Sequence, residues 1–384
     1  MSAGLPIEIR HRPVLDPGFL PAILWNKAYE ARVAATAGSP PLVIALDRPD
    51  ETCFVHRTQV LPHEGENVAL NRRYVERLVK FLLWQKGGNH LTIGGEDHIC
   101  SVLSEIYSEN GERVFDRETM GRKMFRAPIS VEVRAVADMP GPKEATVTLG
   151  RHLDGCRIGF DLGGSDRKCA AVVDGEVVFS EEVAWDPYFQ ADPQYHFNGI
   201  DDTIRRAAER LPRVDSIGGS STGAYANNEV LVASLFRGIS DGDFETHVRR
   251  IFWRLKEKWG GVPFEVTNDG EVTALAGSMS LNDNCVLGIS MGTAEAAGYC
   301  NPAGHITCWL NELAFAPVDY RDGAPRDEWS GDIGCGVQYF SQQAVARLAP
   351  RAGIDLPELV HASKPQECLL GVLEGDKEEV RPGG

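Results

Sequence analysis

A short glycine-rich run in the middle of the chain has the residue types of a phosphate-binding turn. An apolar stretch from Ile158 ends in an acid, Asp161, and is followed by Gly163-Gly164-Ser165 and then by the cation of Lys168. Glycines let the backbone turn sharply and bring its N–H groups close to an anion, and a lysine adds positive charge. The alternative is that these glycines only shape a β-turn.

A second glycine turn repeats this pattern near residue 290. An apolar stretch from Cys285 leads to Met291-Gly292-Thr293, after which small residues continue to Tyr299. One such motif is weak support for a site, but two in one chain favour a pair of loops that hold the phosphates of a nucleotide.

An acid at the end of a predicted strand lies between the two turns. The apolar stretch from Val262 ends in Asn268-Asp269, and a run of small residues typical of a helix follows. Ligands of open α/β sheets bind outside the carboxyl ends of the strands, so Asp269 is a candidate catalytic acid or base. The alternative is that Asp269 caps the helix, and one side chain can do both.

These residues require a meander of strands to position them. Asp174-Gly175 between two apolar runs is a strong hairpin signal, so the first glycine turn joins two strands. Rossmann and P-loop sites need a helix directly after the turn, and the pattern excludes them. Further along, apolar residues at three- and four-residue spacing predict a helix from Asp243, its expected cap, to Gly260.

A strand followed by a Gly/Ser turn is predicted from Val214 to Tyr225. Ser220 and Ser221 in this turn can donate hydrogen bonds to a substrate hydroxyl or merely cap the turn. The structural role is slightly favoured.

The order of these motifs resembles the sugar-kinase superfamily that includes actin, hexokinase and the heat-shock chaperone ATPases. Within it the chain is similar to the ROK group of repressors, open reading frames and kinases, from about Cys156 to Ser341. IGFDLGGSDRK resembles the first phosphate loop, NDGEVTALAG the catalytic Asn-Asp segment, GISMGTAEAAGY the second phosphate loop and ELAFAPVD the sugar-binding stretch. The resemblance implies an α/β fold with an actin-like ATPase (ribonuclease H-like) domain.

The resemblance also implies a reaction, the ATP-dependent phosphorylation of a sugar hydroxyl, with Mg²⁺ as the second cofactor. Asp161 would hold Mg²⁺ directly or through water, and Asp269 would accept the proton of the hydroxyl. The implied contacts to ATP are Gly163, Gly164, Ser165, Lys168, Gly292 and Thr293. The implied contacts to the sugar are Asn268, Asp269, Glu312 and Ser221.

Several positions depart from the ROK pattern. Phe315 stands where the family has a histidine that contacts sugar and a structural zinc, and Glu328 and Ser330 stand where it has cysteines. Cys335 alone is retained, whereas a closed structural zinc site takes about four ligands. We therefore expect no zinc site. Val337-Gln338 replaces a further acidic sugar contact, so sugar recognition should differ from that of a typical glucokinase of the family.

Composition favours a soluble cytoplasmic protein. The chain has 384 residues, 43% of them hydrophobic, which is enough for two domains. The sequence shows neither a stretch long enough to span a membrane nor the apolar core of a signal peptide. Its nine cysteines are scattered and include no Cys-x-x-Cys pair, and a net charge of −16 disfavours binding to nucleic acid.

Residues 1–150 are predicted to form a separate α/β domain of unknown role, with residues 151–384 as the kinase-like domain. Pro41 to Asp47 and the stretch after it read as two strands, and Asn89 to Gly95 as a further strand. The helix between them carries an apolar face of Tyr74, Leu78, Phe81 and Leu82. Gly94-Gly95 can be a ligand turn, but a strand-to-helix turn needs glycine anyway, and we favour that explanation.

The chain ends at Gly384 without the adenosine-binding turn and final helix that the family has after the segment of Cys335. The resemblance therefore implies a C-terminally shortened chain that binds ATP weakly and phosphorylates poorly. A non-catalytic sugar sensor or ROK-type regulator is the alternative, and a DNA-binding repressor is disfavoured by the acidic charge and the lack of a winged helix. A small-molecule sugar is the expected partner, and a homo-oligomer stays open.

Overall fold

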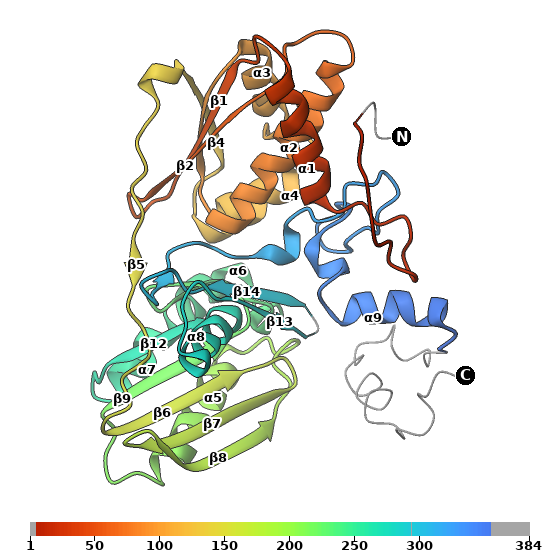
Figure 1. Ribbon diagram of the computed structural model, residues 1–384. Helices are drawn as coiled ribbons and strands as arrows, with labels where there is room; N and C mark the ends of the chain where they lie inside the picture. The colour runs from red at the N-terminus through yellow and green to blue at the C-terminus, as the bar shows by residue number, and fades with distance from the viewer. Residues whose placement is uncertain (1–4, 293, 355–384) are drawn as a thin grey trace.

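The computed structural model of the chain describes residues 5–292 and 294–354. Two sheets with their helices form an upper and a lower half, and the segment that carries β5 (Thr146–Val147) runs between them along one side (Figure 1). The described part of the chain contains no helix that is both long and apolar enough to cross a membrane.

The upper half is built on a four-stranded sheet with the order β2-β1-β3-β4. β1 pairs antiparallel with both β2 and β3, and β3 pairs parallel with β4. Its strands are β1 (Pro41–Asp47), β2 (Cys53–Gln59), β3 (His90–Gly94) and β4 (Ser130–Arg134). Its helices are α1 (Ala22–Ala35), α2 (Asn67–Lys86), α3 (Asp97–Ile106), the short α4 (Val114–Asp116), the π-helical η1 (Arg117–Met124) and the 3₁₀ turn η2 (Val136–Asp138). The strands and the helix predicted in this region are confirmed.

Helix α2 is buried on more than its predicted face. Tyr74, Leu78 and Leu82 are buried as expected, but so are Val75 and Lys80 on other sides of the helix. The reason is that a segment far away in sequence covers α2: the amide of Glu312 donates to the carbonyl of Trp84 at 3.0 Å, and Phe315, Tyr320 and Cys335 belong to the same apolar core. Residues 310–337 therefore share the core of the upper half, and a division of the chain after residue 150 stays a proposal.

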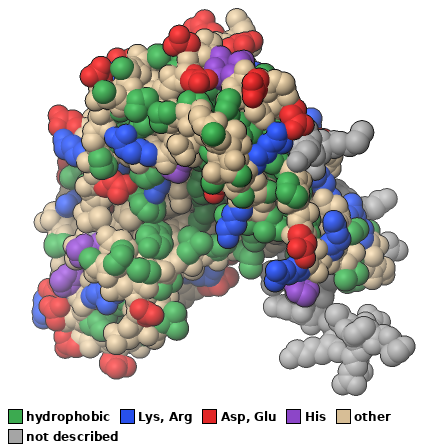
Figure 2. Space-filling view, turned by 45° about the horizontal axis from the view of Figure 1, so that its top comes forward, with side chains coloured by type: hydrophobic (Ala, Val, Ile, Leu, Met, Phe, Trp, Pro, Cys, Tyr) green, Lys and Arg blue, Asp and Glu red, His purple; other side chains and the backbone are tan. Residues whose placement is uncertain are grey.

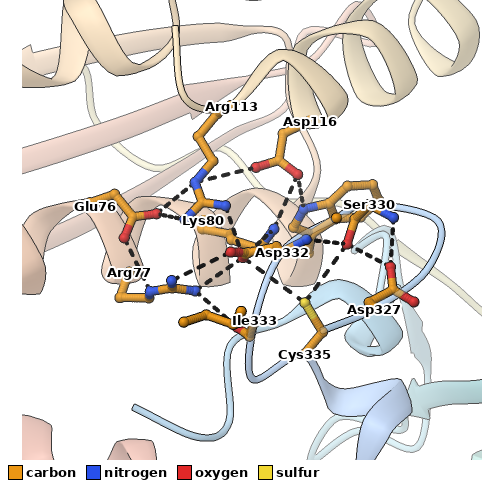
Figure 3. A network of polar contacts seen from close by, with 12 residues as sticks. Glu76, Arg77, Lys80, Arg113, Asp116, Asp327, Ser330, Asp332, Ile333 and Cys335 are labelled. Atoms are coloured by element: carbon orange, nitrogen blue, oxygen red, sulfur yellow. Dashed lines mark hydrogen bonds and ion pairs between the residues drawn. The ribbon is translucent and has the colours of Figure 1, made fainter. Parts of the chain in front are cut away.

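The polar contacts between α2 and this segment are also buried (Figure 3). The ammonium of Lys80 lies 3.3 Å from Asp116 and 3.0 Å from Asp332, and Arg113 lies 2.8 Å from Asp332. Arg77 adds a third cation at 3.0 Å from Asp332. Buried charges are tolerated when each is paired, so this network fixes the loop around Asp332 to α2 and α4.

The lower half is built on a five-stranded sheet with the order β12-β9-β6-β7-β8. β6, β7 and β8 form an antiparallel meander, and β9 and β12 are added parallel to β6 on its other side. The strands are β6 (Cys156–Leu162), β7 (Asp166–Val173), β8 (Glu176–Ala184), β9 (Ser216–Ser221) and β12 (Phe264–Asn268). A three-stranded meander extended by two parallel strands is the ribonuclease H-like arrangement, so the expected fold class is confirmed. The β7–β8 turn has positive φ at both Asp174 and Gly175, as the predicted hairpin requires.

Helices cover this sheet and lead to its parallel strands. The helix predicted from residue 243 to 260 is broken into three parts, and Ser240, not Asp243, caps its start by accepting a hydrogen bond from the amide of Asp243. The parts are α6 (Asp241–Asp243), the π-helical η4 (Phe244–Val248) and α7 (Ile251–Lys258). The other long helices here are α5 (Pro193–Ala208) and α8 (Asp269–Leu281).

Short elements complete the fold. They are the hairpin strands β10 (Ala224–Ala226) and β11 (Glu229–Val232), β13 (Leu287–Met291) and β14 (Glu295–Tyr299), the strand β15 (Ile306–Thr307), which pairs with β5, the helix α9 (Gln342–Leu348), and the turns η3 (Ser234–Phe236), η5 (Leu313–Phe315), η6 (Gly336–Gln338) and η7 (Ala349–Ala352). On the face drawn in Figure 2, acidic and basic side chains are interspersed, so that face offers no broad basic patch to a nucleic acid.

Candidate active site

Three parallel strands of the lower sheet end side by side. Leu162 at the end of β6 is paired with Ser221 at the end of β9, and Ser221 is paired with Asn268 at the end of β12. The chain leaves all three strands at the same edge of the sheet, which is where open α/β sheets bind their ligands. The register therefore brings the first glycine turn and Asp269 together.

The first glycine turn joins β6 to β7. Its shape is fixed by the Gly163 amide, which donates to the carbonyl of Asp166 at 2.9 Å, and by the Gly163 carbonyl, which accepts from the indole of Trp185 at 2.8 Å. A Cβ at Gly164 would lie 2.0 Å from the hydroxyl of Tyr188, so a larger residue there would require this tyrosine to move. Within the described part of the chain the amides of Gly164 and Ser165 have no acceptor, and they are free to bind an anion.

Lys168 lies directly opposite Asp161 in the β6–β7 pair. Its exposed ammonium is 2.9 Å from Asp166, and this hydrogen bond raises the pKa of Lys168. The lysine is therefore a cation at neutral pH, as predicted, but an anion would have to share it with Asp166.

The second glycine turn joins β13 to β14. The Gly292 amide donates to the carbonyl of Ala294 at 3.0 Å, and the Gly292 carbonyl accepts from the amide of Gln342, at the start of α9, at 2.9 Å. The turn is thus attached to the C-terminal segment of the described chain. Thr293, the other residue predicted in this turn, lies outside the described residues.

Asp269 is the first residue of α8, and the cap of this helix is its neighbour. Asn268 accepts from the amide of Gly270 at 2.7 Å and so takes the capping role considered for Asp269. The Oδ2 of Asp269 accepts from the hydroxyl of Thr222 at 3.4 Å. Burial, and after it the charge of Asp161, raises the pKa of Asp269. The Oδ1 of Asp269 also accepts from the Gly270 amide, at 3.2 Å, so the side chain contributes to the cap and still has acceptor capacity for chemistry, close to a second carboxylate.

Asp161 and Ser221 have different surroundings. Asp161 accepts a short hydrogen bond from Ser220. Ser221 is fully buried and accepts from the hydroxyl of Tyr225 at 2.7 Å, and it does not line the cavity described next. This placement fits the structural role that its residue type slightly favoured.

A cavity of about 240 Å³ lies between the two halves beside Asn268. Drug-sized ligands occupy about 300–1,000 Å³, so this space suits a smaller molecule. It is lined from the lower half by Thr222, Gly223, Val232, Ala233, Ser234, Asn268, Ala294, Glu295 and Ala296, from η1 of the upper half by Thr119 and Met124, and from the later segment by Glu312, Ala314, Phe315, Asp327, Glu328, Trp329, Val337 and Gln343. Both Asn268 and Glu312, predicted as sugar contacts, line it.

Two of the acids that line this cavity have raised pKa values. Burial, followed by the charges of Asp269 and Glu295, raises the pKa of Glu312 to about 8. Burial raises the pKa of Glu295 to about 7. Because the pKa of Glu312 responds to both Glu295 and Asp269, the cavity and the end of β12 form one electrostatic site.

Several lining residues had no sequence signal. Glu295 lies in the second phosphate-type turn region, where only the glycines and Thr293 were singled out. Thr119 and Met124 come from the π-helical segment of the N-terminal region, and neither a motif nor a periodicity connects them with the kinase-like region. π-Helical turns often occur at functional sites, but their presence cannot be recognised from residue types alone.

The position of the family's zinc ligands is filled by other groups. Phe315 packs on Trp84, with ring centroids 4.5 Å apart, and on Trp329, with centroids 5.5 Å apart. Burial raises the pKa of Cys335 to about 11. Its sulfur lies beside Ser330 and Asp332, within the network of Figure 3 that contains the ammonium of Lys80.

A second cavity, of about 300 Å³, lies between β7, β8 and α5. Its one basic lining residue among those described, Arg167, is bound to Asp202 at 2.9 Å. Because this arginine already has its partner and none of the predicted site residues lines this cavity, the chemistry is assigned to the cavity beside Asn268.

No protein-family model matches the sequence, and no curated protein is significantly similar to it. Solved structures do match. A ROK family glucokinase from Streptomyces griseus, in complex with glucose and AMPPNP, is 20% identical with a TM-score of 0.42, over 58% of this chain and 67% of that one. A ROK hexokinase from Thermus thermophilus is 17% identical with a TM-score of 0.40, over 58% and 70% of the two chains.

A ROK family transcriptional regulator, a homologue of the E. coli MLC protein, also matches. It is 19% identical with a TM-score of 0.41, over 59% of this chain and 58% of that one. The kinases and the regulator thus match this chain with nearly the same sequence identity and TM-score. The fold assignment of this chain rests on its strand order, and its function has to be argued from its own site.

Proposed function

We propose that this chain is an ATP-dependent kinase that phosphorylates a hydroxyl of a small sugar. The observation that carries the proposal is the position of Asp269, at the end of β12, between the first glycine turn and a cavity that Asn268 and Glu312 line. Phosphoryl transfer needs a base near the acceptor hydroxyl and donors that hold the phosphates in line with it. The edge of the sheet supplies both in one place.

The phosphates of ATP would lie against the first turn and Lys168 on one side and against Gly292 and Thr293 on the other. Asp161 would hold Mg²⁺, which neutralises phosphate charge when it is bound. The residues fit this role, because Mg²⁺ is usually bound by one or two carboxylates together with water and phosphate, and Asp161 lies close enough to Asp269 for its charge to raise the pKa of Asp269. A larger protein cage is not required.

Asp269 would take the proton of the acceptor hydroxyl. Its raised pKa brings the carboxylate closer to the range in which a general base is effective at neutral pH. The hydrogen bond from Thr222 orients the carboxylate. Asn268, whose Nδ2 donates to the carbonyl of Gly223 at 2.6 Å, would present the rest of its polar surface to the sugar together with Glu312.

A non-catalytic sugar sensor or ROK-type regulator is the second candidate. Phe315 and Val337 line the cavity where the resembled family has polar sugar contacts, so sugar binding without efficient transfer is a definite alternative. A cytoplasmic location belongs to the same proposal and is supported by the eight described cysteines, all of which are free thiols. A homo-oligomer is also proposed, and no interface for it is identified among the described residues.

The test is an ATP-turnover assay with a panel of hexoses and amino sugars. Asp269→Asn is expected to reduce sugar-dependent transfer by at least ~10², as the loss of a general base usually does, while sugar binding persists. Asp192→Asn is the matched control, because Asp192 caps α5 and does not line the cavity, and Asn caps helices equally well. Sugar binding without any ATP turnover in the wild type would favour the sensor.

A further inference from the structure

The cavity beside Asn268 is lined by acids and lacks a cation. Four carboxyl side chains line it, those of Glu295, Glu312, Asp327 and Glu328, and none of its described lining residues is Lys, Arg or His. The nearby cations of Figure 3 are already paired with carboxylates, Lys80 with Asp116 and Asp332. A ligand in this cavity therefore meets carboxyl groups that no described lining cation neutralises.

Two of the four carboxyls are available to a ligand within the cavity. Asp327 accepts from the amide and the hydroxyl of Ser330, at 2.6 and 2.5 Å, and Glu328 is exposed to water. Glu295 is only 4% exposed, and its Oε2 has no hydrogen-bond partner among the described residues. Glu312 is likewise not bonded to a described cation. A buried carboxyl without a partner is costly, and such a group in a binding cavity points to a ligand that supplies the partner.

Glu295 is also held in place. A Cβ at Gly336 would lie 2.4 Å from its Oε2, so the carboxyl is packed against the backbone of Gly336, and Ala297 near it is buried. The side chain would have to leave this contact to reach solvent, so the carboxyl stays beside the cavity that it lines.

We propose that the cavity binds an amino sugar with a free ammonium group, which Glu295 and Glu312 hold. This inference rests on the proposed sugar-kinase function and specifies the substrate class of the same site. The apolar part of the lining, including Met124, Phe315 and Trp329, would face the C–H surface of the sugar ring. An ammonium donates three hydrogen bonds and supplies the charge that the cavity lacks.

The charged neighbours set the pH dependence. Asp327 and Glu328 line the cavity, and Asp269 and Glu271 of α8 interact electrostatically with Glu312, so these charged neighbours are all acidic. Burial raises the pKa of Glu295 to about 7, so below that pH the free protein carries a proton there. Binding of an ammonium then expels a proton to solvent, and the affinity for the amine should rise with pH until the amine itself loses its charge.

The experiment is titration calorimetry without nucleotide, with glucosamine, glucose and N-acetylglucosamine, in two buffers of different ionisation enthalpy. At about pH 6, below the raised pKa values, glucosamine should release up to one proton per carboxyl, and glucose none. At neutral pH glucosamine should bind at least ~10-fold more tightly than glucose or N-acetylglucosamine, as expected for charge-assisted hydrogen bonds.

Glu295→Gln keeps the shape of the side chain and removes its charge. It should reduce the preference for glucosamine and remove the share of the proton release that comes from Glu295, and it should raise the melting temperature of the ligand-free protein, because a buried ionisable group without a partner is removed. The matched control is Glu265→Gln. Burial also raises the pKa of Glu265, but its carboxylate accepts from Asn228 at 3.2 Å and does not line the cavity, so the preference should survive.

Equal or tighter binding of glucose, no binding of glucosamine, or an undiminished preference in Glu295→Gln overturns the inference. If Glu295→Gln does not fold, Glu312→Gln gives the same comparison. Glucosamine binding with proton release but without ATP turnover supports the inference and rejects the kinase, so the two failures are distinguishable.

Discussion

Gly298 of β14 lies directly against Glu271 of α8, so that a Cβ on Gly298 would be 2.3 Å from the Cα of Glu271. Two further glycines make similar contacts: a Cβ on Gly270 would be 2.4 Å from the amide nitrogen of Ala297, and one on Gly288 would be 2.3 Å from that of Ala274. The helix that starts with Asp269 is thus packed on the backbone of the hairpin that carries the second glycine turn. Backbone contact of this kind fixes the distance between α8 and the β13–β14 hairpin, because neither can shift toward the other without a steric clash.

We first predict that Gly298→Ala is strongly disruptive. The added methyl meets backbone and cannot be accommodated by a rotamer change, so the free energy of unfolding should fall by about 1–3 kcal/mol or more. Any residual transfer activity should show a raised KM for ATP, because the second turn moves relative to Asp269. Chemical denaturation and steady-state kinetics measure the two effects.

Gly159→Ala is the matched control. Gly159 lies in β6 of the same half, has no positive φ and has nothing within 4 Å of its added Cβ. This change should be neutral or stabilise by about 0.4–1 kcal/mol through the unfolded chain. Equal losses in both variants would show that the close packing of α8 is not the cause.

The second prediction concerns stability against pH. Burial raises the pKa of Glu271 to about 8, far above its value in an unfolded chain, about 4.3. Between these values the folded state binds more protons than the unfolded state, so the free energy of unfolding should fall as the pH rises from about 5 to about 8. Glu312 and Glu295 act in the same direction.

Glu271→Gln should flatten this pH dependence and stabilise the protein at pH 8 by on the order of 1 kcal/mol or more. The amide oxygen can still accept the hydrogen bond that Thr267 donates to Glu271. Urea midpoints across the pH range, for the wild type and for this variant, measure the effect. A slope that is the same in both proteins would mean that Glu271 ionises normally in the folded state.

The ribonuclease H-like sheet was predictable from the sequence because its signals are local. Asp174-Gly175 specifies a two-residue hairpin, and each apolar strand is followed by glycines or by an acid at its end. Pairing of the parallel strands could be expected from the motif order, and the register confirmed that Leu162, Ser221 and Asn268 end together. The position of Asp269 in the site followed from that expectation.

The cavity was not predictable, because its walls are brought together by contacts between distant segments. Nothing in the sequence around Met124 or Glu312 shows that η1 and residues 310–337 lie on opposite sides of one small space. The helix predicted from Asp243 shows a second limit. Its apolar spacing was correct, but spacing does not encode the π-helical segment η4 or the choice of Ser240 as the cap.

The third prediction is that the protein binds no stoichiometric zinc. Cys335 has a pKa raised by burial to about 11, so it is protonated at neutral pH, whereas zinc needs the thiolate. Its surroundings contain the cation Lys80, which repels a metal ion. Elemental analysis of tag-free protein should find less than a tenth of an equivalent, as an approximate limit; one tightly held zinc per chain would contradict the assignment of these positions.

The last prediction concerns Asp332, which holds the loop of Asp327 and Trp329 against α2. Burial alone would raise the pKa of Asp332, but the charges of Lys80, Arg77 and Arg113 outweigh it and keep the pKa well below its usual range. Asp332→Asn leaves these buried cations without their shared partner, and the expected loss is about 3–5 kcal/mol in the free energy of unfolding.

The control for this change is Asp154→Asn. Asp154 also pairs with an arginine, Arg157 at 3.1 Å, but its side chain is 87% exposed, so the loss should be at most about 1 kcal/mol.

The two wild-type carboxylates also differ in their response to acid. The stability that Asp332 provides is present above the unfolded pKa of about 3.9 and is lost as the pH falls below it, so wild type and Asp332→Asn should converge in strong acid. Because the loop forms one wall of the cavity, Asp332→Asn should also weaken sugar binding under conditions in which the protein remains folded, and Asp154→Asn should not. Unchanged sugar affinity in a folded Asp332→Asn protein would show that the network stabilises the fold without positioning the site.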